Sequence, residues 1–551
     1  MKRFSLILVT LIILLGLAVY ANSLQGQFIW DDGVFVRDNA YIRDWSRLIP
    51  VFTGDSGAGS SVKMNCYRPI QILTYIVDYS LCGLNVSGYH LTNVILHIAV
   101  ALAVYWLVLL IFGSLPLSFF TSMLFVAHPV HTEAVSYISG RADILSALFI
   151  LLFLIFYIKN TCQLNLKSYI LMLSSCVLAF LSKENALVIA PLLLLYHYIF
   201  RRRIRWWFFL TPLIISLFYL LLRPVRLVSF SFGPAMIIKR IPGFFAAFAD
   251  YLKILLLPVN LHMEYGNKLF NIIQPQVLSG LGAFFLLLFL ALRKRGAKRV
   301  ISFAILWFFA ALLPTTSIYP VHSFYMAEHW LYLPSIGFFL ILGWGLALLY
   351  EKKNWRFAAL GLAACLLSLY SYLTVKQNNY WRDELGFYKR TLEYTPKSPM
   401  AHNNLGNIYS RAGDEATATK EYLKAIKFDP RLFEAYYSLG NAYHNLGKID
   451  KAMEMMRKAI ELNPGYLEAY NDLASDYAQT GNIEEALKLW NEAVRRDPGF
   501  ATAHFNLSVY YFRRKQYDQA LSHCDKVLEL GYQVDPRFLK QLEPFRSKRE
   551  R

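Results

Sequence analysis

Residues 90–112 read HLTNVILHIAVALAVYWLVLLIF, an apolar run without Asp, Glu, Lys or Arg. A helix of about 20 apolar residues crosses the hydrocarbon core of a bilayer, so this run predicts a transmembrane helix. The whole chain is biased in the same way, because 56% of its 551 residues are hydrophobic and only 17% are charged. Soluble domains contain about a quarter charged residues. The composition therefore argues against an ordinary soluble protein, and so much apolar surface excludes a disordered chain.

Similar runs recur up to residue 376, where polar and periodic sequence begins. Phe4–Ala21 is either a first span or a cleaved signal peptide, and a span is favoured because no small-x-small cleavage site follows it. The predicted spans are Phe4–Ala21, His90–Phe112, Leu117–Ala134, Ala142–Ile158, Ser168–Leu181, Ala186–Phe200, Trp206–Leu222, Gln276–Leu292, Val300–Leu313, Trp330–Tyr350 and Phe357–Val375. The apolar segment Phe244–Pro258 is expected to be re-entrant or interfacial, because a full crossing there would put the basic cluster at 293–299 outside.

Most of the formal net charge of +19 lies in the ends and loops on one side of this map. Basic residues favour the cytoplasmic side, so their excess is an orientation signal and gives no support to a nucleic-acid partner. An odd number of spans then places everything after Val375 outside. We expect a multi-pass protein of a bacterial inner membrane with a periplasmic C-terminal half, or of the endoplasmic reticulum membrane with a luminal one in a eukaryote.

The second half of the chain is an internal repeat with a period of 34 residues. Pro396, Pro430, Pro464 and Pro498 mark this period, and the columns between them are Leu405/Leu439/Leu473/Leu507, Tyr409/Tyr443/Tyr477/Tyr511 and Ala418/Ala452/Ala486/Ala520. Period and columns are typical of tetratricopeptide repeats, which are helical hairpins stacked into a solenoid. We expect a membrane domain at 1–376, a connecting half-repeat helix at 377–398, four repeats at 399–534 and a capping helix or tail at 535–551.

Two adjacent acids follow the first predicted span, in the stretch FIWDD at residues 28–32. One carboxylate, Asp31 or Asp32, can act as a general base on an acceptor hydroxyl near the bilayer surface. Together they can instead hold a divalent cation such as Mg²⁺ or Mn²⁺ beside a phosphate leaving group. A third interpretation is a solvated turn, because Asp-Asp-Gly is good turn chemistry.

Further polar residues gather in the next loops of the same side. His128, His131 and Glu133 raise the question of zinc, but their spacing is not HExxH and Pro129 interrupts a helix there. Contact with a substrate phosphate is favoured over zinc, and a structural pair is the alternative. Cations that match phosphoryl oxygens are Arg68, Arg141 and Lys183, which can also simply pair with Asp143 and Glu184. His97 is expected to make an interhelical hydrogen bond.

Several motifs, in their order along the chain, resemble one known family. They are FIWDD at 28–32, YRP at 67–69, YHLTNVILH at 89–97, AHPVHTEAV at 127–135 with GRAD at 140–143, LSKEN at 181–185 and AEHWLYLPS at 327–335. With C-terminal tetratricopeptide repeats, they look like the transmembrane and tetratricopeptide-repeat-containing O-mannosyltransferases. The repeat array is short for that family, and His329 stands where an Arg is usual.

The resemblance implies an all-α GT-C helical bundle of about eleven transmembrane helices followed by a repeat solenoid. It implies an inverting transfer of a sugar, typically mannose, from a polyprenyl-phosphate donor to Ser or Thr hydroxyls of proteins on the outer face. Asp31 or Asp32 is then the base, and Arg68, His128, His131, Arg141 and Lys183 are candidates for the phosphate side. Supporting residues are Glu133, Asp143, Glu184, Glu328 and His329. The resemblance leaves the metal question open.

The repeats suggest a site for acceptor polypeptides. Asn side chains can hydrogen-bond an extended peptide backbone without reading its side chains. A similar Asn ladder occurs in the nucleocytoplasmic O-GlcNAc transferase, although Asn is also simply common in such helices. The candidate positions are Asn403, Asn404, Asn407, Asn441, Asn471 and Asn506.

Two rival functions remain at this point. An O-antigen ligase or polymerase would place its chemistry in a large late outer loop, which here holds Arg223, Arg226 and His262. A membrane-anchored scaffold would use the repeats alone to recruit partners. The first outer loop also contains Cys66 and Cys82, which can form a disulfide in an oxidising compartment.

Overall fold

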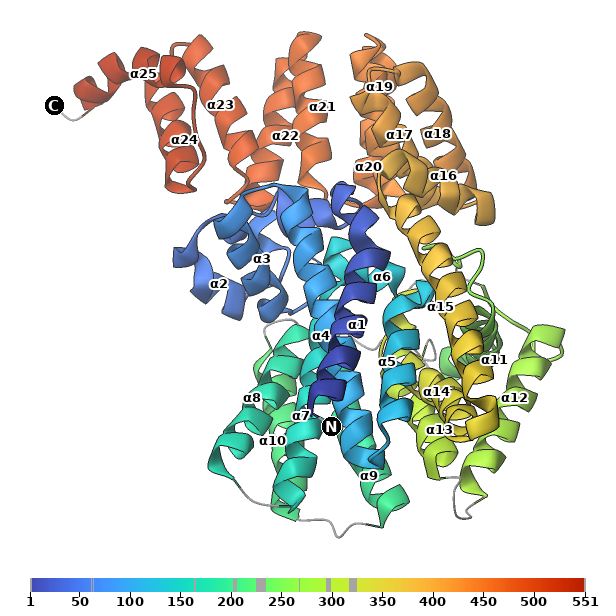
Figure 1. Ribbon diagram of the computed structural model, residues 1–551. Coiled ribbons are helices and arrows are strands. Elements are labelled where there is room, and N and C mark those ends of the chain that lie inside the picture. The colour runs from blue at the N-terminus through green and yellow to red at the C-terminus, as the bar shows by residue number, and fades with distance from the viewer. Residues whose placement is uncertain are drawn as a thin grey trace. The chain divides into compact units, whose positions relative to one another are not determined.

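The chain folds entirely into helices and loops over the residues that the computed structural model describes, which are 2–60, 62, 64–162, 165–201, 206–223, 234–266, 268–293, 299–316 and 325–549 (Figure 1). It forms two compact units, Met1–Tyr394 and Thr395–Arg551. The predicted all-α architecture is therefore confirmed for this part of the chain.

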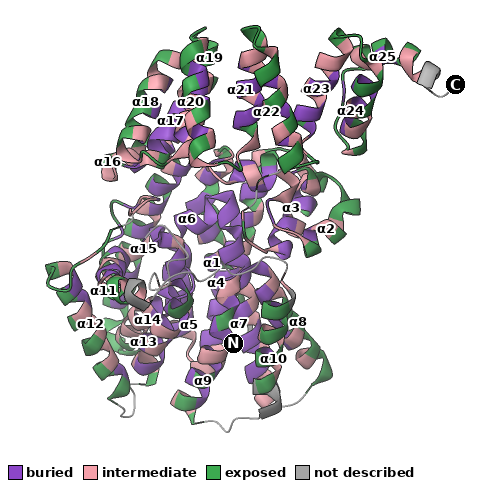
Figure 2. Ribbon diagram, turned by 180° about the vertical axis from the view of Figure 1, so that it is seen from behind, coloured by how far each residue is buried: buried purple, intermediate pink, exposed green. Residues whose placement is uncertain are grey.

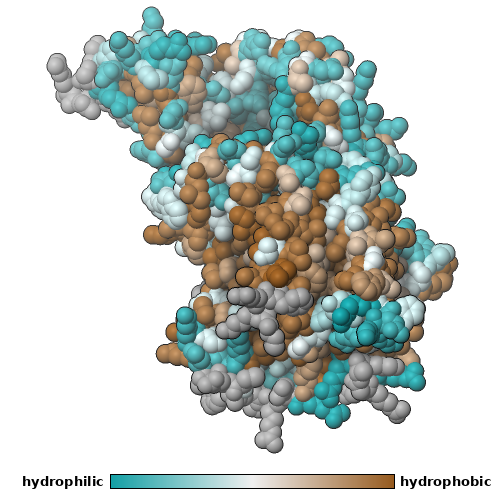
Figure 3. Space-filling model, viewed as in Figure 1, coloured by the Kyte–Doolittle hydropathy of each residue, from teal (hydrophilic) through white to brown (hydrophobic). Residues whose placement is uncertain are grey.

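Each of the eleven predicted spans corresponds to one apolar helix of the first unit. These helices are α1 (Lys2–Tyr20), α4 (Val86–Phe112), α5 (Leu115–Ala127), α7 (Arg141–Cys162), α8 (Leu166–Ser182), α9 (Ile189–Phe200), α10 (Trp206–Leu222), α12 (Pro275–Leu292), α13 (Arg299–Leu312), α14 (Ser335–Glu351) and α15 (Arg356–Asn378). Five segments are long and apolar enough to cross a membrane: Ser5–Gln25, Val86–Phe112, Ile138–Thr161, Pro275–Leu292 and Lys353–Trp381. Hydrophobic side chains gather over α1, α4 and α5 (Figure 3), as expected of an integral membrane protein.

Two predicted spans were too long, and both errors have a local cause. The span predicted to end at Ala134 ends as α5 at Ala127, because His128 leaves the helical conformation and its Nδ1 accepts the Val130 amide to start a 3₁₀ turn, η6 (Pro129–His131). The span predicted from Trp330 begins only with α14 at Ser335, because Glu328–Leu331 forms a separate 3₁₀ turn, η11. The predicted re-entrant segment Phe244–Pro258 overlaps a longer helix, α11 (Pro234–Leu256), which carries charged residues in both halves and ends two residues before Pro258.

The helices of the first unit approach closely where small residues meet. A Cβ at Gly343 of α14 would lie 2.9 Å from the backbone nitrogen of Thr121 in α5. One polar link crosses the same region, since His97 of α4 contacts the Tyr332 hydroxyl through Nδ1 at 2.6 Å and the Val126 carbonyl through Nε2 at 3.3 Å. The interhelical hydrogen bond predicted for His97 is confirmed. The connections between these helices add α2 (Leu48–Thr53), α3 (Pro69–Cys82) and the short α6 (Thr132–Val135). The residues of α6 are all buried (Figure 2).

The second unit consists of four helical hairpins and a terminal helix. The hairpins are α17 (Pro399–Arg411) with α18 (Glu415–Phe428), α19 (Phe433–Asn445) with α20 (Ile449–Leu462), α21 (Leu467–Gln479) with α22 (Ile483–Arg496), and α23 (Ala501–Arg513) with α24 (Tyr517–Glu529). The terminal helix is α25 (Pro536–Arg549). Gly406 lets its hairpin close, because a Cβ there would lie 2.5 Å from Cε1 of Tyr422. The predicted half-repeat helix is α16 (Glu384–Tyr394), which belongs to the first unit.

Candidate active site

The two adjacent acids of the first outer loop have different surroundings. Asp32 is buried, and each of its oxygens accepts hydrogen bonds from the backbone. Its Oδ1 accepts the Ser139 amide at 2.8 Å and also the Ser139 hydroxyl, while its Oδ2 accepts the Ile29 amide at 3.0 Å. Asp32 therefore ties its own loop to the 3₁₀ turn η7 (Ile138–Gly140), and this contact leaves it no open face for a substrate.

Asp31 is partly exposed beside this anchored loop. Burial raises the pKa of its carboxyl to about 6, although the Tyr137 hydroxyl and the Arg68 guanidinium both act to lower it. A carboxylate with a pKa closer to neutrality is a stronger base than an ordinary one. Burial raises the pKa of Asp32 further, to about 7, so basicity does not separate the two acids. Asp31 differs from Asp32 in its accessibility, which proton abstraction from a substrate also requires.

A chain of charged residues leads away from Asp31 across one set of helix ends, at the start of α3 and α7 and the end of α8. Arg68 lies at the start of α3 and pairs with Glu184 at 3.7 Å; the Arg68 side chain is 18% exposed. The neighbouring Lys183 donates to both oxygens of Asp143 at 2.8 Å. The structure thus brings together two predicted phosphate ligands, Arg68 and Lys183, with two predicted supporting acids.

Of these charged residues, Asp143 also lines a small cavity of about 10 Å³. Asp143, Ser146, Asn185 and His329 are its polar lining residues, and Ala311 of α13 lies on its wall. His329 is held at this wall by Glu133, whose two carboxylate oxygens contact the His329 Nδ1 at 2.7 Å and its backbone amide at 2.8 Å. The carboxylate contact at Nδ1 fixes the orientation of the imidazole ring, and Nε2 takes no part in this contact. With 26% of its side chain exposed, His329 is an accessible polar group here.

Glu328, the last predicted supporting residue, is buried behind His329. Its Oε1 accepts the His262 amide and the Tyr265 hydroxyl, both at 2.7 Å. Burial and the neighbouring Glu133 raise the pKa of Glu328 well above its usual value. These contacts fix the path of the loop that follows α11, so the role of Glu328 is to hold this loop in place.

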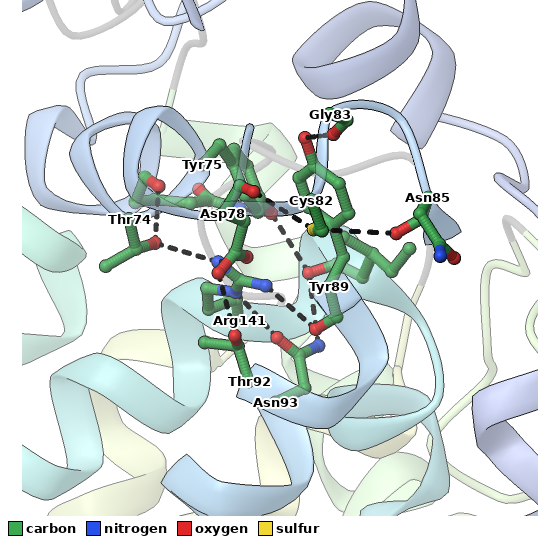
Figure 4. Close-up of polar contacts among 12 residues, drawn as sticks. Thr74, Tyr75, Asp78, Cys82, Gly83, Asn85, Tyr89, Thr92, Asn93 and Arg141 are labelled. Atoms are coloured by element: carbon green, nitrogen blue, oxygen red, sulfur yellow. Dashed lines mark hydrogen bonds and ion pairs between the residues drawn. The ribbon is translucent and has the colours of Figure 1, made fainter. Parts of the chain in front are cut away.

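Arg141 differs most from its predicted role as a phosphate ligand, because its side chain is fully buried. Its guanidinium pairs with Asp78 at 2.6 Å and donates to Asn93 Oδ1 at 2.6 Å, to the Tyr89 carbonyl at 2.9 Å and to Thr74 Oγ1 at 3.1 Å (Figure 4). These partners come from α3 and α4. The arrangement gives Arg141 the role of a buried tie between three helices, without an exposed face for a phosphate.

The two histidines of the AHPVHTEAV motif are also fully buried. His128 Nε2 contacts the Leu255 carbonyl at 3.2 Å, and His131 contacts the Phe125 carbonyl through Nδ1 at 2.8 Å and the Ser335 hydroxyl through Nε2 at 3.0 Å. Both imidazoles therefore use their nitrogens inside the protein. They match the structural alternative for this motif better than the predicted phosphate contact.

No group of three or more His, Cys, Asp or Glu side chains suited to a metal ion occurs among the described residues. Cys66 and Cys82 are separate free thiols, and Cys82 donates to the Asp78 carbonyl. In the late outer loop, His262 stacks on Tyr394 with ring centroids 4.5 Å apart, whereas Arg226 lies outside the described residues. The His262 contacts are structural and do not favour the ligase interpretation.

The six candidate asparagines lie on the first helices of the hairpins in the second unit. Several are bound to other side chains of the unit. Asn506 Nδ2 donates to Asn471 Oδ1 at 2.7 Å, and Asn407 Oδ1 accepts the Tyr422 hydroxyl at 2.8 Å. Asn403 Nδ2 donates to Asn404 Oδ1, and the Asn403 Oδ1 atom is buried without a hydrogen-bond partner. Asn404, Asn407, Asn441 and Asn506 are partly exposed, while Asn403 and Asn471 are buried.

Sequence models of the tetratricopeptide repeat match residues 387–420, 412–447, 433–466 and 471–532. The C-terminal part is a tetratricopeptide-repeat array. The first match begins inside α16, as the projected half-repeat requires. A crystal structure of MamA is similar at 27% identity over 27% of this chain and 86% of its own, with a TM-score of 0.25.

Curated relatives extend the similarity into the membrane part of the chain. Protein O-mannosyl-transferase F38B6.6 of Caenorhabditis elegans is 28% identical over 442 residues, 75% of this chain and 62% of that protein. Human protein O-mannosyl-transferase TMTC1 is 26% identical over 74% of this chain and 53% of its own length. Human TMTC2 is 36% identical over 154 residues, 26% of this chain and 18% of that protein. The chain spans about three-fifths of the length of the first of these relatives. These similarities confirm the family resemblance that the motifs predicted.

Two features of the site were not predicted from the sequence. The Glu133–His329 pair joins residues 196 apart. A stack of aromatic rings, Trp30, Tyr137 and Trp381, lies beside Asp31. The motifs contained most of these residues, but only the fold places them against each other.

Proposed function

We propose that this chain is a membrane protein O-mannosyltransferase. It would move mannose from a polyprenyl-phosphate donor to a Ser or Thr hydroxyl, with inversion, on the outer face of a bacterial inner membrane or the luminal face of the endoplasmic reticulum. The observation that carries the proposal is Asp31, a partly exposed carboxyl with a raised pKa beside Arg68, which in turn lies near Glu184 and Asp143. The reaction class is that in the names of the relatives, which are protein O-mannosyl-transferases.

The chemistry requires a base on one side of the sugar and charge stabilisation on the other. The Asp31 carboxylate takes the proton of the acceptor hydroxyl while that oxygen bonds to the anomeric carbon. The bond from the anomeric carbon to the phosphate oxygen breaks, and its electron pair stays on the phosphate. Arg68 and Lys183 stabilise this developing negative charge, and His329 can add a donor from the cavity wall. Inversion follows because the acceptor attacks opposite the leaving phosphate.

An apolar cavity supports a lipid-linked donor. It has a volume of about 950 Å³ and is lined by side chains of α9, α11, α12 and α13, among them Leu194, Phe244, Phe284 and Phe309. Ala310 and Leu312 of α13 line this apolar cavity, while Ala311 between them lines the small polar cavity. One helix therefore borders both spaces. A polyprenyl tail would occupy the apolar cavity, whereas the second cavity, of about 10 Å³, has room for a water molecule and not for a phosphate.

The repeat array would bind the acceptor polypeptide, since such solenoids present extended binding surfaces. Asn404, Asn407, Asn441 and Asn506, which are partly exposed, are the asparagines available for a peptide backbone. The buried Asn403 and Asn471 would hold the side chains of Asn404 and Asn506 in place through hydrogen bonds.

The test of the function is transfer by the purified full chain in lipid nanodiscs. With polyprenyl-phosphate mannose and a panel of Ser/Thr-rich peptides, we expect a mass increment of one hexose on the peptide, located on a hydroxyl by fragmentation. Polyprenyl phosphate without sugar is the control donor. No increment with any peptide, while the donor stays intact, would contradict the proposal and favour the scaffold.

The pH dependence of transfer should follow the Asp31 carboxyl. Because the base must be ionised, the rate should fall as the pH drops through about 6, where an ordinary carboxyl would keep it constant down to about 4. The Tyr137 hydroxyl lowers the pKa of Asp31, so Tyr137→Phe should move the acid limb of kcat/KM to higher pH. An acid limb near pH 4 in the wild type, or one that Tyr137→Phe leaves in place, would remove Asp31 as the base.

A further inference from the structure

Three aromatic rings are stacked in a row beside Asp31. The ring centroids of Trp30 and Tyr137 are 5.6 Å apart with an interplanar angle of 21°, and those of Tyr137 and Trp381 are 5.5 Å apart at 27°. Phe387 extends the row behind Trp381, with centroids 4.9 Å apart. Tyr137, Trp381 and Phe387 are buried, whereas Trp30 is partly exposed. Trp30 is therefore the accessible end of a buried aromatic column.

The backbone at Trp30 is held in an unfavourable conformation. Its φ of +53° lies in the left-handed region, which is unfavourable for a residue with a Cβ. Local contacts maintain it, because the Gly33 amide donates to the Trp30 carbonyl at 3.2 Å and the Asp32 carboxylate holds the Ile29 amide. Strain of this kind persists where the surroundings over-determine the conformation, often at functional sites. Here it fixes an indole next to the proposed base.

The column also excludes simpler explanations for Trp30. An aromatic residue of the membrane interface needs neither a strained backbone nor a row of buried rings behind it. A residue that only fills the core would be buried like Tyr137. A rigid, partly exposed indole at the end of such a row is suited to present its π face to a ligand, since its position is fixed before binding.

We propose that the accessible indole of Trp30 binds the hexose ring of the lipid-linked donor, holding the sugar beside Asp31. The face of an aromatic ring carries negative charge density, and the C–H groups on one face of a hexose are weakly positive. Stacking between them orients the ring without using its hydroxyls. Trp30 is then a donor-binding residue, and this inference rests on the proposed function.

The test compares two lipids that differ only in the sugar. Polyprenyl-phosphate mannose and polyprenyl phosphate are each titrated into the full chain in nanodiscs, for the wild type, Trp30→Ala, Trp30→Phe and the control Trp45→Ala. Trp45 lies in the same outer loop, is exposed and bonds to Ser80. Thermal unfolding of each variant verifies the fold, and Trp30→Phe keeps a ring on Tyr137.

We expect Trp30→Ala to weaken binding of the mannosyl lipid by about tenfold, with a smaller loss in Trp30→Phe. Binding of the unsugared lipid and all values for Trp45→Ala should be unchanged. Equal losses for both lipids, or no loss for either, would overturn the inference, as would a change confined to the KM of the acceptor peptide. Binding is measured without turnover, so a selective loss stands even if no transfer occurs, and normal binding by Trp30→Ala with full transfer leaves the proposed function intact.

Discussion

Asp31→Asn reduces the rate of transfer by about 10²–10⁴-fold, the range that a positioned general base contributes. The amide keeps the size of the side chain but cannot accept the acceptor's proton. Because burial raises the pKa of Asp31, the ionised carboxyl costs stability in the folded protein at neutral pH. The variant should therefore unfold at the same temperature as the wild type or higher. Single-turnover transfer and thermal unfolding measure the two quantities.

Asp32→Asn is the matched control, one residue away. Its new amide group replaces an oxygen that accepts a backbone N–H, so one of the contacts to Ile29 or Ser139 must be lost. An unsatisfied buried donor costs about 1–3 kcal/mol. Loss of the buried charge offsets part of this cost, because burial raises the pKa of Asp32 to about 7. This variant should lower the unfolding temperature and should retain transfer in the fraction that stays folded. The opposite pattern, with rate lost only in Asp32→Asn, would make Asp32 the base.

Much of the architecture was predictable because the sequence contains two clear patterns, the 34-residue repeat and the apolar runs of the membrane part. The 34-residue columns are visible because each close contact between helices accepts only a residue of suitable size. Gly406, which packs against Tyr422, illustrates this. Apolar runs in the membrane part likewise mark their helices, because a bilayer tolerates few charges. The errors fell at residues 128–134 and 330–334, where hydropathy continues but hydrogen bonds end the helix.

The site was predictable only in outline. The motifs named the residues, but residue type does not tell whether a cation faces a substrate or a buried acid. Lys183 and Arg141 illustrate this, since both pair with buried acids, the first with Asp143 and the second with Asp78. A signal for the second pair was present, because Asp78 is the one acid in the helix PIQILTYIVDYSLC. A lone acid in an apolar helix calls for a partner.

Breaking this buried pair should have the largest effect on stability. Arg141→Met removes the charge that compensates Asp78, and removing one partner of a buried ion pair costs about 3–5 kcal/mol. The Asn93, Tyr89 and Thr74 oxygens lose their donor as well. We expect little folded protein from Arg141→Met and from Arg141→Lys, because an ammonium group cannot satisfy the several partners that the guanidinium fork reaches.

The decisive comparison is the double variant Arg141→Met/Asp78→Leu, in which neither charge remains. Replacing a buried ion pair by apolar side chains is often neutral or stabilising, so the double variant should recover much of the unfolding temperature lost in Arg141→Met. If Arg141 only ties α3 and α4 to α7, transfer should return with the fold. Recovery of the fold without transfer would instead return Arg141 to the phosphate side of the reaction, and the buried arrangement of Figure 4 would then have to open during turnover.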